Sequence, residues 1–134
     1  MGDCPVQDLS DLLNVPYARA AVLLQIRVGS VDYQVYLRHG TGNGQSDAAM
    51  AKGASVFPLA DVQIQGHTHK PKITVDDYFV VQDGRLQRRS RHNTVSGSFL
   101  GYERYAAERG YQPTRIGAPR IRLDGYVRDV KVSV

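Results

Sequence analysis

Residues 20–38 read Ala-Ala-Val-Leu-Leu-Gln-Ile-Arg-Val-Gly-Ser-Val-Asp-Tyr-Gln-Val-Tyr-Leu-Arg, and they carry the clearest structural signal in the chain. The apolar run Ala20–Val28 is typical of a buried strand. Gly29-Ser30 then predicts a two-residue turn, and the Val- and Tyr-rich segment Val31–Arg38 returns as the hairpin partner. We expect this antiparallel hairpin to share one sheet layer with Asp61–Gln65 and with the later strands.

Turn and periodicity signals predict two further hairpins and three helices. Asp83-Gly84 would join Tyr78–Gln82 to Arg85–Arg91, and Asp124-Gly125 would join Ile121–Leu123 to Tyr126–Val134. A short strand is expected over Ala60–Gln65, and helices are expected over Val6–Leu13, Ser46–Val56 and Tyr102–Arg109. The predicted fold class is mixed α/β (α+β), with mainly antiparallel strands in the C-terminal part.

Length and composition are those of one ordinary domain spanning residues 1–134. Of the 134 residues, 42% are hydrophobic and 22% are charged, which argues against wholesale disorder. No apolar run approaches the ~20 residues that a membrane span needs, and the N-terminus lacks the pattern of a secretory signal. The single cysteine, Cys4, excludes an internal disulfide and a multi-cysteine zinc finger. We therefore expect a cytoplasmic protein without a membrane partner.

Positive charge gathers in the second half of the chain. Residues 1–66 hold 4 Lys/Arg and 6 Asp/Glu, whereas residues 67–134 hold 13 and 7. An anionic partner, such as a phosphate ester or a nucleic acid, is one interpretation, and a solvated basic face is the other. The segment 85–91 would place three arginines on one strand face and Arg88 on the other, without interleaved aromatic residues. This pattern favours a solvated edge strand whose charged side chains prevent pairing with another strand.

The strongest chemical signal is Gly66-His67-Thr68-His69, which follows the predicted strand. Histidines at i and i+2 point to the same side of an extended segment. Neutral imidazole is the commonest metal ligand, so the two side chains could share one metal ion or flank a pair. Two exposed loop histidines are the alternative interpretation.

A third histidine, His39, also ends a predicted strand. The glycine-rich loop Gly40–Gly44 follows it and lacks the Gly-Lys-Ser/Thr ending of a P-loop. Three histidines at strand ends could bind a single zinc ion or supply the nitrogen ligands of a dinuclear site. The fourth histidine, His92, has no partner pattern and is expected at the surface.

The order of these motifs resembles the C-terminal half of the calcineurin-like metallophosphoesterases, and phage and prophage members in particular. The resemblance covers the chain from about Leu9 to Leu123. It rests on four segments: His39-Gly40, Gly66-His67-Thr68-His69, Val95-Ser96-Gly97-Ser98-Phe99-Leu100 and Ile116-Gly117-Ala118-Pro119. It implies a hydrolase that cleaves phosphate mono- or diesters and a β-sandwich with flanking helices that holds two metal ions.

The resemblance also implies which histidine binds which of the two metal ions. His39 and His67 would ligate one metal and His69 the other, while Gly40 and Gly66 would support the loops that present them. Neutral histidine donors suit Mn, Fe, Zn or Ni better than Mg or Ca. Two such ions would clamp a phosphate ester and activate a bridging water.

The sequence departs from the family in lacking Asp-x-His, Gly-Asp-x-x-Asp and Gly-Asn-His. The resemblance therefore implies an N-terminally truncated domain with an incomplete metal site and no assigned catalytic residue. Asp61 would lie far from the histidines, and Asp47 is the acidic residue that could approach His39. A separate chain carrying the first half is the expected partner, and an inactive binding module is the alternative. Apolar surface near Ala20–Val28 would then be exposed and would favour dimerisation or aggregation.

Overall fold

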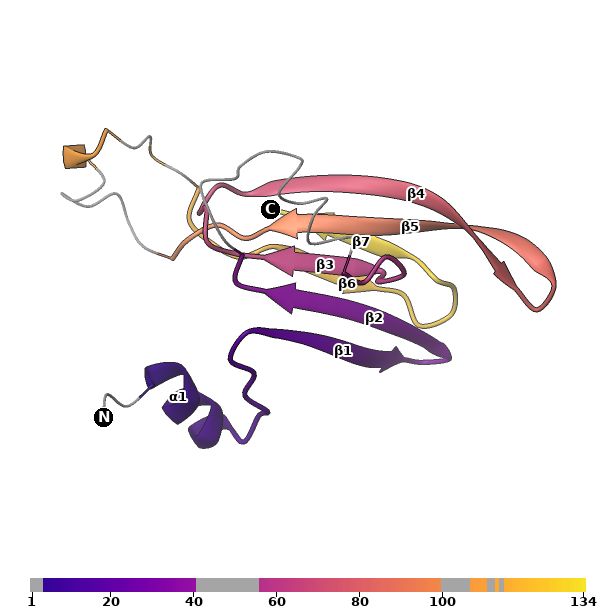
Figure 1. The fold of residues 1–134 in the computed structure, drawn as a ribbon, viewed down its shortest axis with the longest axis horizontal. Helices are drawn as coiled ribbons and strands as arrows, with labels where there is room; N and C mark the ends of the chain where they lie inside the picture. The colour runs from indigo at the N-terminus through magenta and orange to yellow at the C-terminus, as the bar shows by residue number, and fades with distance from the viewer. Residues whose placement is uncertain (1–3, 41–55, 100–106, 111–112, 114) are drawn as a thin grey trace.

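The computed structural model describes residues 4–40, 56–99, 107–110, 113 and 115–134. These residues form a mixed α+β fold made mostly of strands (Figure 1). The elements are α1 (Pro5–Leu13), β1 (Ala21–Val28), β2 (Val31–Arg38), β3 (Val62–Gln65), β4 (Lys72–Gln82), β5 (Arg85–Val95), β6 (Arg120–Leu123) and β7 (Val130–Ser133). None of the described helices is both long and apolar enough to cross a membrane.

Five strands form one sheet in the order β1-β2-β3-β5-β4. Two antiparallel hairpins, β1–β2 and β4–β5, flank the short strand β3, which pairs in parallel with both β2 and β5. The prediction that the first hairpin and the segment after Asp61 share one layer with the later strands is confirmed for β4 and β5, whereas β6 and β7 form a separate sheet. The hairpin β4–β5 is longer than predicted, and its tip reaches beyond the other strands (Figure 1).

The core lies between this sheet and a second, two-stranded sheet formed by β6 and β7. Alternate residues of β2 are buried on the facing side because successive side chains of a strand point to opposite faces. The fully buried cluster contains Val31, Tyr33, Val35, Val62 and Val130. The β6–β7 ribbon, yellow in Figure 1, therefore forms a second layer over the strands β2 and β3.

The hydroxyl of Tyr33 fixes the β6–β7 connection to the main sheet. Its oxygen lies 2.7 Å from the carbonyl oxygen of Asp124 and 3.1 Å from those of Val127 and Asp129. It also accepts a hydrogen bond from the Asp129 N–H at 3.1 Å. The hydroxyl has a single proton, so it donates to one of these three carbonyl groups at a time while it accepts from the Asp129 N–H. It thereby ties β2 to a loop some 90 residues away in sequence.

A second buried contact reinforces this attachment. The carboxylate of Asp61 accepts a hydrogen bond from the Gln34 N–H at 2.8 Å and forms an ion pair with Arg128 at 2.7 Å. The main chain of Asp61 bonds to both neighbouring strands, through the Gln34 carbonyl and the His92 N–H, each at 2.9 Å. Asp61 therefore holds β2, β5 and the β6–β7 loop around the start of β3.

The structure corrects the expected burial of Ala20–Val28. β1 is an edge strand, and its side chains are exposed or only partly buried. An apolar run alone does not distinguish a central strand from an edge strand whose partner lies elsewhere. Leu23 and Leu24, which point to opposite faces of the strand, are 41% and 39% exposed. The large apolar patch expected near this segment stays a prediction.

The Asp124-Gly125 turn is also corrected. Instead of two residues, the connection between β6 and β7 spans residues 124–129, closed by a bond from the Asp124 N–H to the Asp129 carbonyl at 3.1 Å. The Asp124 carboxylate accepts hydrogen bonds from the N–H groups of Tyr126 and Val127, which lower its pKa. The side chain thus stabilises a wider loop than the dipeptide predicts.

The remaining predicted elements have mixed outcomes. The helix Val6–Leu13 is confirmed as α1, and both the Gly29-Ser30 and Asp83-Gly84 turns are confirmed. The arginine-rich strand β5 is an interior strand, not the expected edge, and Arg88 and Arg91 pair with Asp77 and Asp76 of β4. The predicted helix Ser46–Val56 and most of Tyr102–Arg109 lie outside the described residues.

We predict that Tyr33→Phe lowers the free energy of unfolding by about 1–3 kcal/mol, because it leaves buried carbonyl and N–H groups of the β6–β7 loop without their partner. Tyr126→Phe is the matched control, since Tyr126 is 92% exposed and should change stability by less than about 0.5 kcal/mol. Urea unfolding of the two variants measures the difference. Equal stabilities would contradict the anchoring role of Tyr33.

Candidate functional site

The candidate site lies at the edge of the sheet where three parallel strands end. β2, β3 and β5 run in the same direction, so their carboxyl ends meet at one edge. Hydrogen bonds join the segments that follow these strands. The Gly66 N–H donates to the His39 carbonyl at 3.0 Å, and the Ser96 N–H donates to the Gln65 carbonyl at 2.8 Å. Loops from distant parts of the sequence are therefore held together at this edge.

Two of the predicted ligands contact each other there. His39 Nε2 and His67 Nδ1 are 3.2 Å apart, within hydrogen-bond distance. The two imidazole rings meet edge to face, with centroids 5.1 Å apart and an interplanar angle of 77°. The predicted convergence of His39 with His67 is confirmed, although the two residues are 28 positions apart in sequence.

The backbone that presents the histidines is strained. His67 and His69 have φ angles of 75° and 58°, in the left-handed region that non-glycine residues rarely adopt. A hydrogen bond from the Thr68 N–H to the Gly66 carbonyl, at 3.0 Å, closes a tight three-residue turn around His67. Such strain persists where surrounding structure enforces it, and it is concentrated at functional sites. The sequence gives no sign of it, because neither residue is a glycine or an asparagine.

Gly40 and Gly66 leave room for this turn. Gly40 has a φ of 93°, and a Cβ atom there would lie 3.3 Å from the Gly66 carbonyl oxygen and 3.4 Å from His67 Cβ. A Cβ on Gly66 would lie 3.5 Å from the His39 carbonyl oxygen. The predicted supporting role of both glycines therefore has a steric basis at Gly40, where the two loops approach most closely.

His69 does not join this pair. Across the part of the chain that the structure describes, no three His, Cys, Asp or Glu side chains are grouped so that they could hold a metal ion. The three-histidine convergence predicted from the sequence is thus reduced to the pair His39 and His67. Asp61 is engaged with Arg128 and Gln34, as described above, and Asp47 lies outside the described residues. The assignment of His39, His67 and His69 as metal ligands stays a prediction.

His92 differs from its predicted surface position. It lies in the interior strand β5, where its side chain is half-buried and its Nδ1 atom is buried without a hydrogen-bond partner. Its main chain donates to Asp61, so it belongs to the sheet attachment and not to the histidine pair. A single histidine in a polar strand gives no sequence signal that distinguishes an exposed position from a half-buried position in an interior strand.

Sequence reasoning missed a polar layer that lies between the strands near the site. Gln63, Gln65 and Asn93 are almost fully buried. Arg38 donates to Gln65 Oε1 at 2.7 Å, and the Asn93 amide donates to Asp76 at 2.7 Å. The alternation Val62-Gln-Ile-Gln65 is typical of a strand with one solvated face, so the sequence gives no sign that its glutamines are buried. These contacts fix the side chains directly before the turns that carry His39 and His67.

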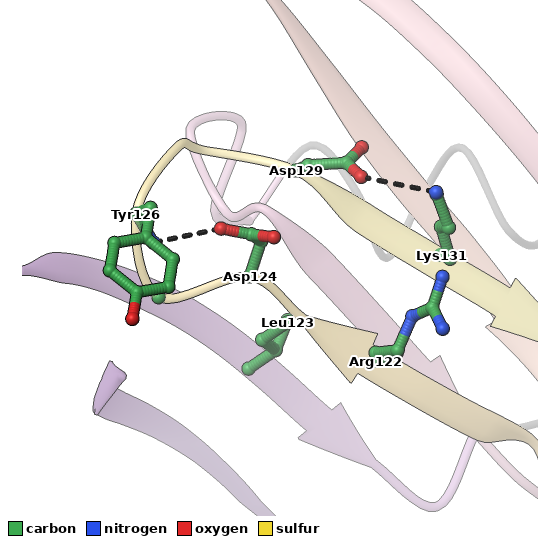
Figure 2. Close-up of a pocket in the computed structure, with 7 residues that line it drawn as sticks. Arg122, Leu123, Asp124, Tyr126, Asp129 and Lys131 are labelled. Atoms are coloured by element: carbon green, nitrogen blue, oxygen red, sulfur yellow. Dashed lines mark hydrogen bonds and ion pairs between the residues drawn. The ribbon is translucent and has the colours of Figure 1, made fainter. Parts of the chain in front are cut away.

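A separate hollow of about 400 Å³ lies at the other end of the molecule (Figure 2). It is lined by Arg122, Leu123, Asp124, Gly125, Tyr126, Asp129 and Lys131. The Ser30 N–H, just before β2, donates to the Gly125 carbonyl at 2.9 Å, whereas His39 follows the opposite end of β2. Lys131 pairs with Asp129 at 3.7 Å. The hollow therefore combines both charges and is remote from the histidine pair.

No family model, no curated protein and no solved structure matches this chain. The interpretation of the site therefore depends on the geometry of the histidine pair and on the motif resemblance described above.

We predict that Gly40→Ala destabilises the fold more than Gly84→Ala. Both glycines have positive φ angles, but a Cβ atom at Gly84 meets nothing within 4 Å. Gly84→Ala should cost about 1–2 kcal/mol for the left-handed backbone alone, and Gly40→Ala should cost about 1 kcal/mol more from crowding against the His67 turn. Urea unfolding gives the two values, and the imidazole NMR signals of His39 and His67 should shift in the Gly40 variant alone. Equal costs with unchanged signals would contradict close packing of the two loops.

Proposed function

We propose that this chain supplies the histidine ligands of a metal-dependent phosphoesterase whose remaining ligands come from a separate chain. The observation that supports it is the pair His39 and His67, 3.2 Å apart at the edge where the parallel strands end. The family resemblance of the surrounding motifs supports the same proposal and gives the substrate class, phosphate mono- or diesters.

The separation of the two nitrogens fits a shared transition-metal ion. Zinc–nitrogen bonds are about 2.0–2.1 Å long, and a tetrahedral angle between two such bonds places the nitrogens about 3.3 Å apart. The observed 3.2 Å between His39 Nε2 and His67 Nδ1 agrees with this spacing. The same pair can instead share one proton as a hydrogen bond, so metal and proton compete for the site. Imidazole donors favour Mn, Fe, Zn or Ni.

The described residues fit half of a dinuclear centre. Two dications held close together need a bridging carboxylate to offset their repulsion, and the described part of the chain contributes no carboxylate to the histidine pair. The charged residues nearest to the pair in sequence, Arg38 beside His39 and Lys70 after His67, are positive. A partner chain with the missing aspartate, asparagine and histidine ligands would complete the site.

In the complete enzyme, bound metal would supply Lewis-acid activation of the phosphate ester and of the attacking water. The residues of this chain would bind and orient. His39 and His67 would hold one metal, His69 would face the second, and Gly40 and Gly66 would allow the two loops to meet. The packing of the β6–β7 ribbon on the main sheet is compatible with one side of the β-sandwich that the resemblance implies.

An inactive binding module is the second candidate function. The incomplete ligand set favours it, because two histidines without a carboxylate bind metal but do not assemble the bridged pair of ions that hydrolysis requires. The two candidates differ in what a partner chain adds. Only the phosphoesterase half gains activity when the missing ligands are supplied.

We predict that the isolated chain binds one zinc ion weakly through His39 and His67. His67→Asn should weaken binding at least about tenfold, or about 1.4 kcal/mol. His69→Asn is the matched control, because both residues occupy the left-handed region that asparagine tolerates, and it should leave the affinity for this ion within about threefold. Calorimetric titration of both variants makes the comparison. Equal loss in both variants, or loss in neither, would contradict the assignment.

We further predict that the isolated chain does not hydrolyse an aryl phosphate with Mn²⁺, because no carboxylate among the described residues joins the histidine pair to bridge two ions. Activity should appear on mixing with the product of an adjacent reading frame that encodes Asp-x-His and Gly-Asn-His. Continued inactivity of the mixture would support the binding module instead. Two tight metal sites and Mn²⁺-stimulated turnover in the chain alone would contradict the need for a partner.

A further inference from the structure

The two edges of the main sheet differ in how they are protected against pairing with another strand. Natural edge strands usually carry charged residues, prolines or bulges that prevent such pairing. At one edge, β4 contains Lys72, Asp76 and Asp77. At the other edge, β1 has the sequence AVLLQIRV, in which Arg27 is the one charged residue. The edge formed by β1 is therefore the less protected of the two.

Arg27 protects this edge poorly because it is already engaged with the neighbouring strand. Its Nε atom donates to Asp32 Oδ1 at 2.7 Å, and a second guanidinium nitrogen donates to Asp32 Oδ2 at 2.8 Å. This bidentate contact lowers the pKa of Asp32 and directs the guanidinium toward β2. β1 also has no proline and no bulge, since its register with β2 is continuous from Ala21 to Val28.

The apolar side chains of β1 remain accessible on both faces. Leu23 and Leu24 are among the exposed large hydrophobic residues, and as neighbours they point to opposite faces of the sheet. Among the described strands, none pairs with the outer side of β1. Its outward N–H and C=O groups and its leucines are thus available to a further strand.

A second apolar surface lies on the same side of the molecule. The helix α1 precedes β1 and is on the β1 side of the sheet in Figure 1, away from β4. Leu9, Leu12 and Leu13 of α1, which lie on one face of the helix, are all more than half exposed. The hydrogen bonds that α1 makes within the described residues are local, such as that from the Ser10 hydroxyl to the Val15 carbonyl at 2.5 Å. The exposed apolar side chains of α1 and β1 together make up an apolar border on this side of the sheet.

We propose that two copies of this chain associate through this border, with β1 pairing antiparallel to β1 of the second copy. Repulsion between the two Arg27 side chains favours the antiparallel arrangement over the parallel one. Parallel pairing would place the two Arg27 side chains together, whereas antiparallel pairing separates them by about 13–20 Å at ~3.3 Å per residue. A two-fold axis perpendicular to the sheet also keeps equivalent faces on the same side, so that Val22, Leu24 and Ile26 meet the same residues of the second copy.

The interface must include α1, because a stable dimer buries more surface area than β1 alone provides. A specific interface buries on the order of 1,200–2,000 Å² in total, which is more than one eight-residue strand pair provides on its own. The exposed leucine face of α1 supplies further apolar area at the same edge. The pairing would join two five-stranded sheets into one continuous sheet. This proposal does not depend on the phosphoesterase function.

Analytical ultracentrifugation of the full chain tests the association. The chain should sediment as a dimer at high micromolar concentration and dissociate on dilution. Leu23→Lys/Leu24→Lys should be monomeric, whereas Phe79→Lys/Val81→Lys, which places two lysines at exposed positions of β4, should remain dimeric. Circular dichroism confirms that each variant is folded. A monomeric wild-type chain, or equal dissociation of both variants, would overturn the proposal.

Disulfide trapping in a Cys4→Ser background tests the geometry even if the lysine variants fail to fold. Leu24→Cys or Gln25→Cys, which lie nearest the centre of an antiparallel pair, should cross-link two copies rapidly under mild oxidation. Arg27→Cys should not, because its counterpart lies well beyond the reach of a disulfide. Cross-linking at Arg27 that is as fast as at the central positions, or no cross-linking at either central position, would overturn the antiparallel arrangement.

Discussion

The buried carboxylate of Asp61 is the contact on which the rest of the structure depends. β3 is four residues long, and it joins two hairpins that are not hydrogen-bonded to each other within the described sheet. The carboxylate of Asp61, at the start of β3, bonds to β2 through the Gln34 N–H and to the β6–β7 loop through Arg128, while the main-chain carbonyl of Asp61 accepts from the His92 N–H of β5. A buried charge is stable only when it is paired and hydrogen-bonded, and these contacts satisfy both conditions. Without them the parallel strands would lose their alignment.

The alignment of the parallel strands in turn creates the histidine pair. His39 and His67 each follow a strand by one or two residues, so any shift of β3 against β2 would separate their rings. Gly40 permits the close approach, and the left-handed backbone of His67 turns its ring toward His39. The strain at His67 is therefore balanced by a sheet whose register is fixed at the opposite end of β3, by Asp61.

Much of this arrangement follows from local signals in the sequence. Gly29-Ser30 and Asp83-Gly84 define the two long hairpins because their residues suit tight turns, and the placement of His39 and His67 after strands brings them to one edge. The features that could not be predicted depend on distant residues. The Tyr33 hydroxyl lies within hydrogen-bond distance of three carbonyl groups of the β6–β7 loop and accepts from the Asp129 N–H, so the Asp124-Gly125 dipeptide does not act as a local two-residue turn. The apolar run of β1 gives no information on strand order, which places it at the edge. His69 illustrates the same limit, since i and i+2 histidines share one side of a strand but not of a turn with left-handed residues.

The central claim is that the pair His39 and His67 is a metal site. The most direct measurement is a crystal structure of the chain soaked in zinc, with anomalous scattering recorded at the zinc edge. We predict one strong peak within bonding distance of both His39 Nε2 and His67 Nδ1. No peak between these nitrogens at saturating zinc, with the two rings still in mutual hydrogen-bond contact, would contradict it.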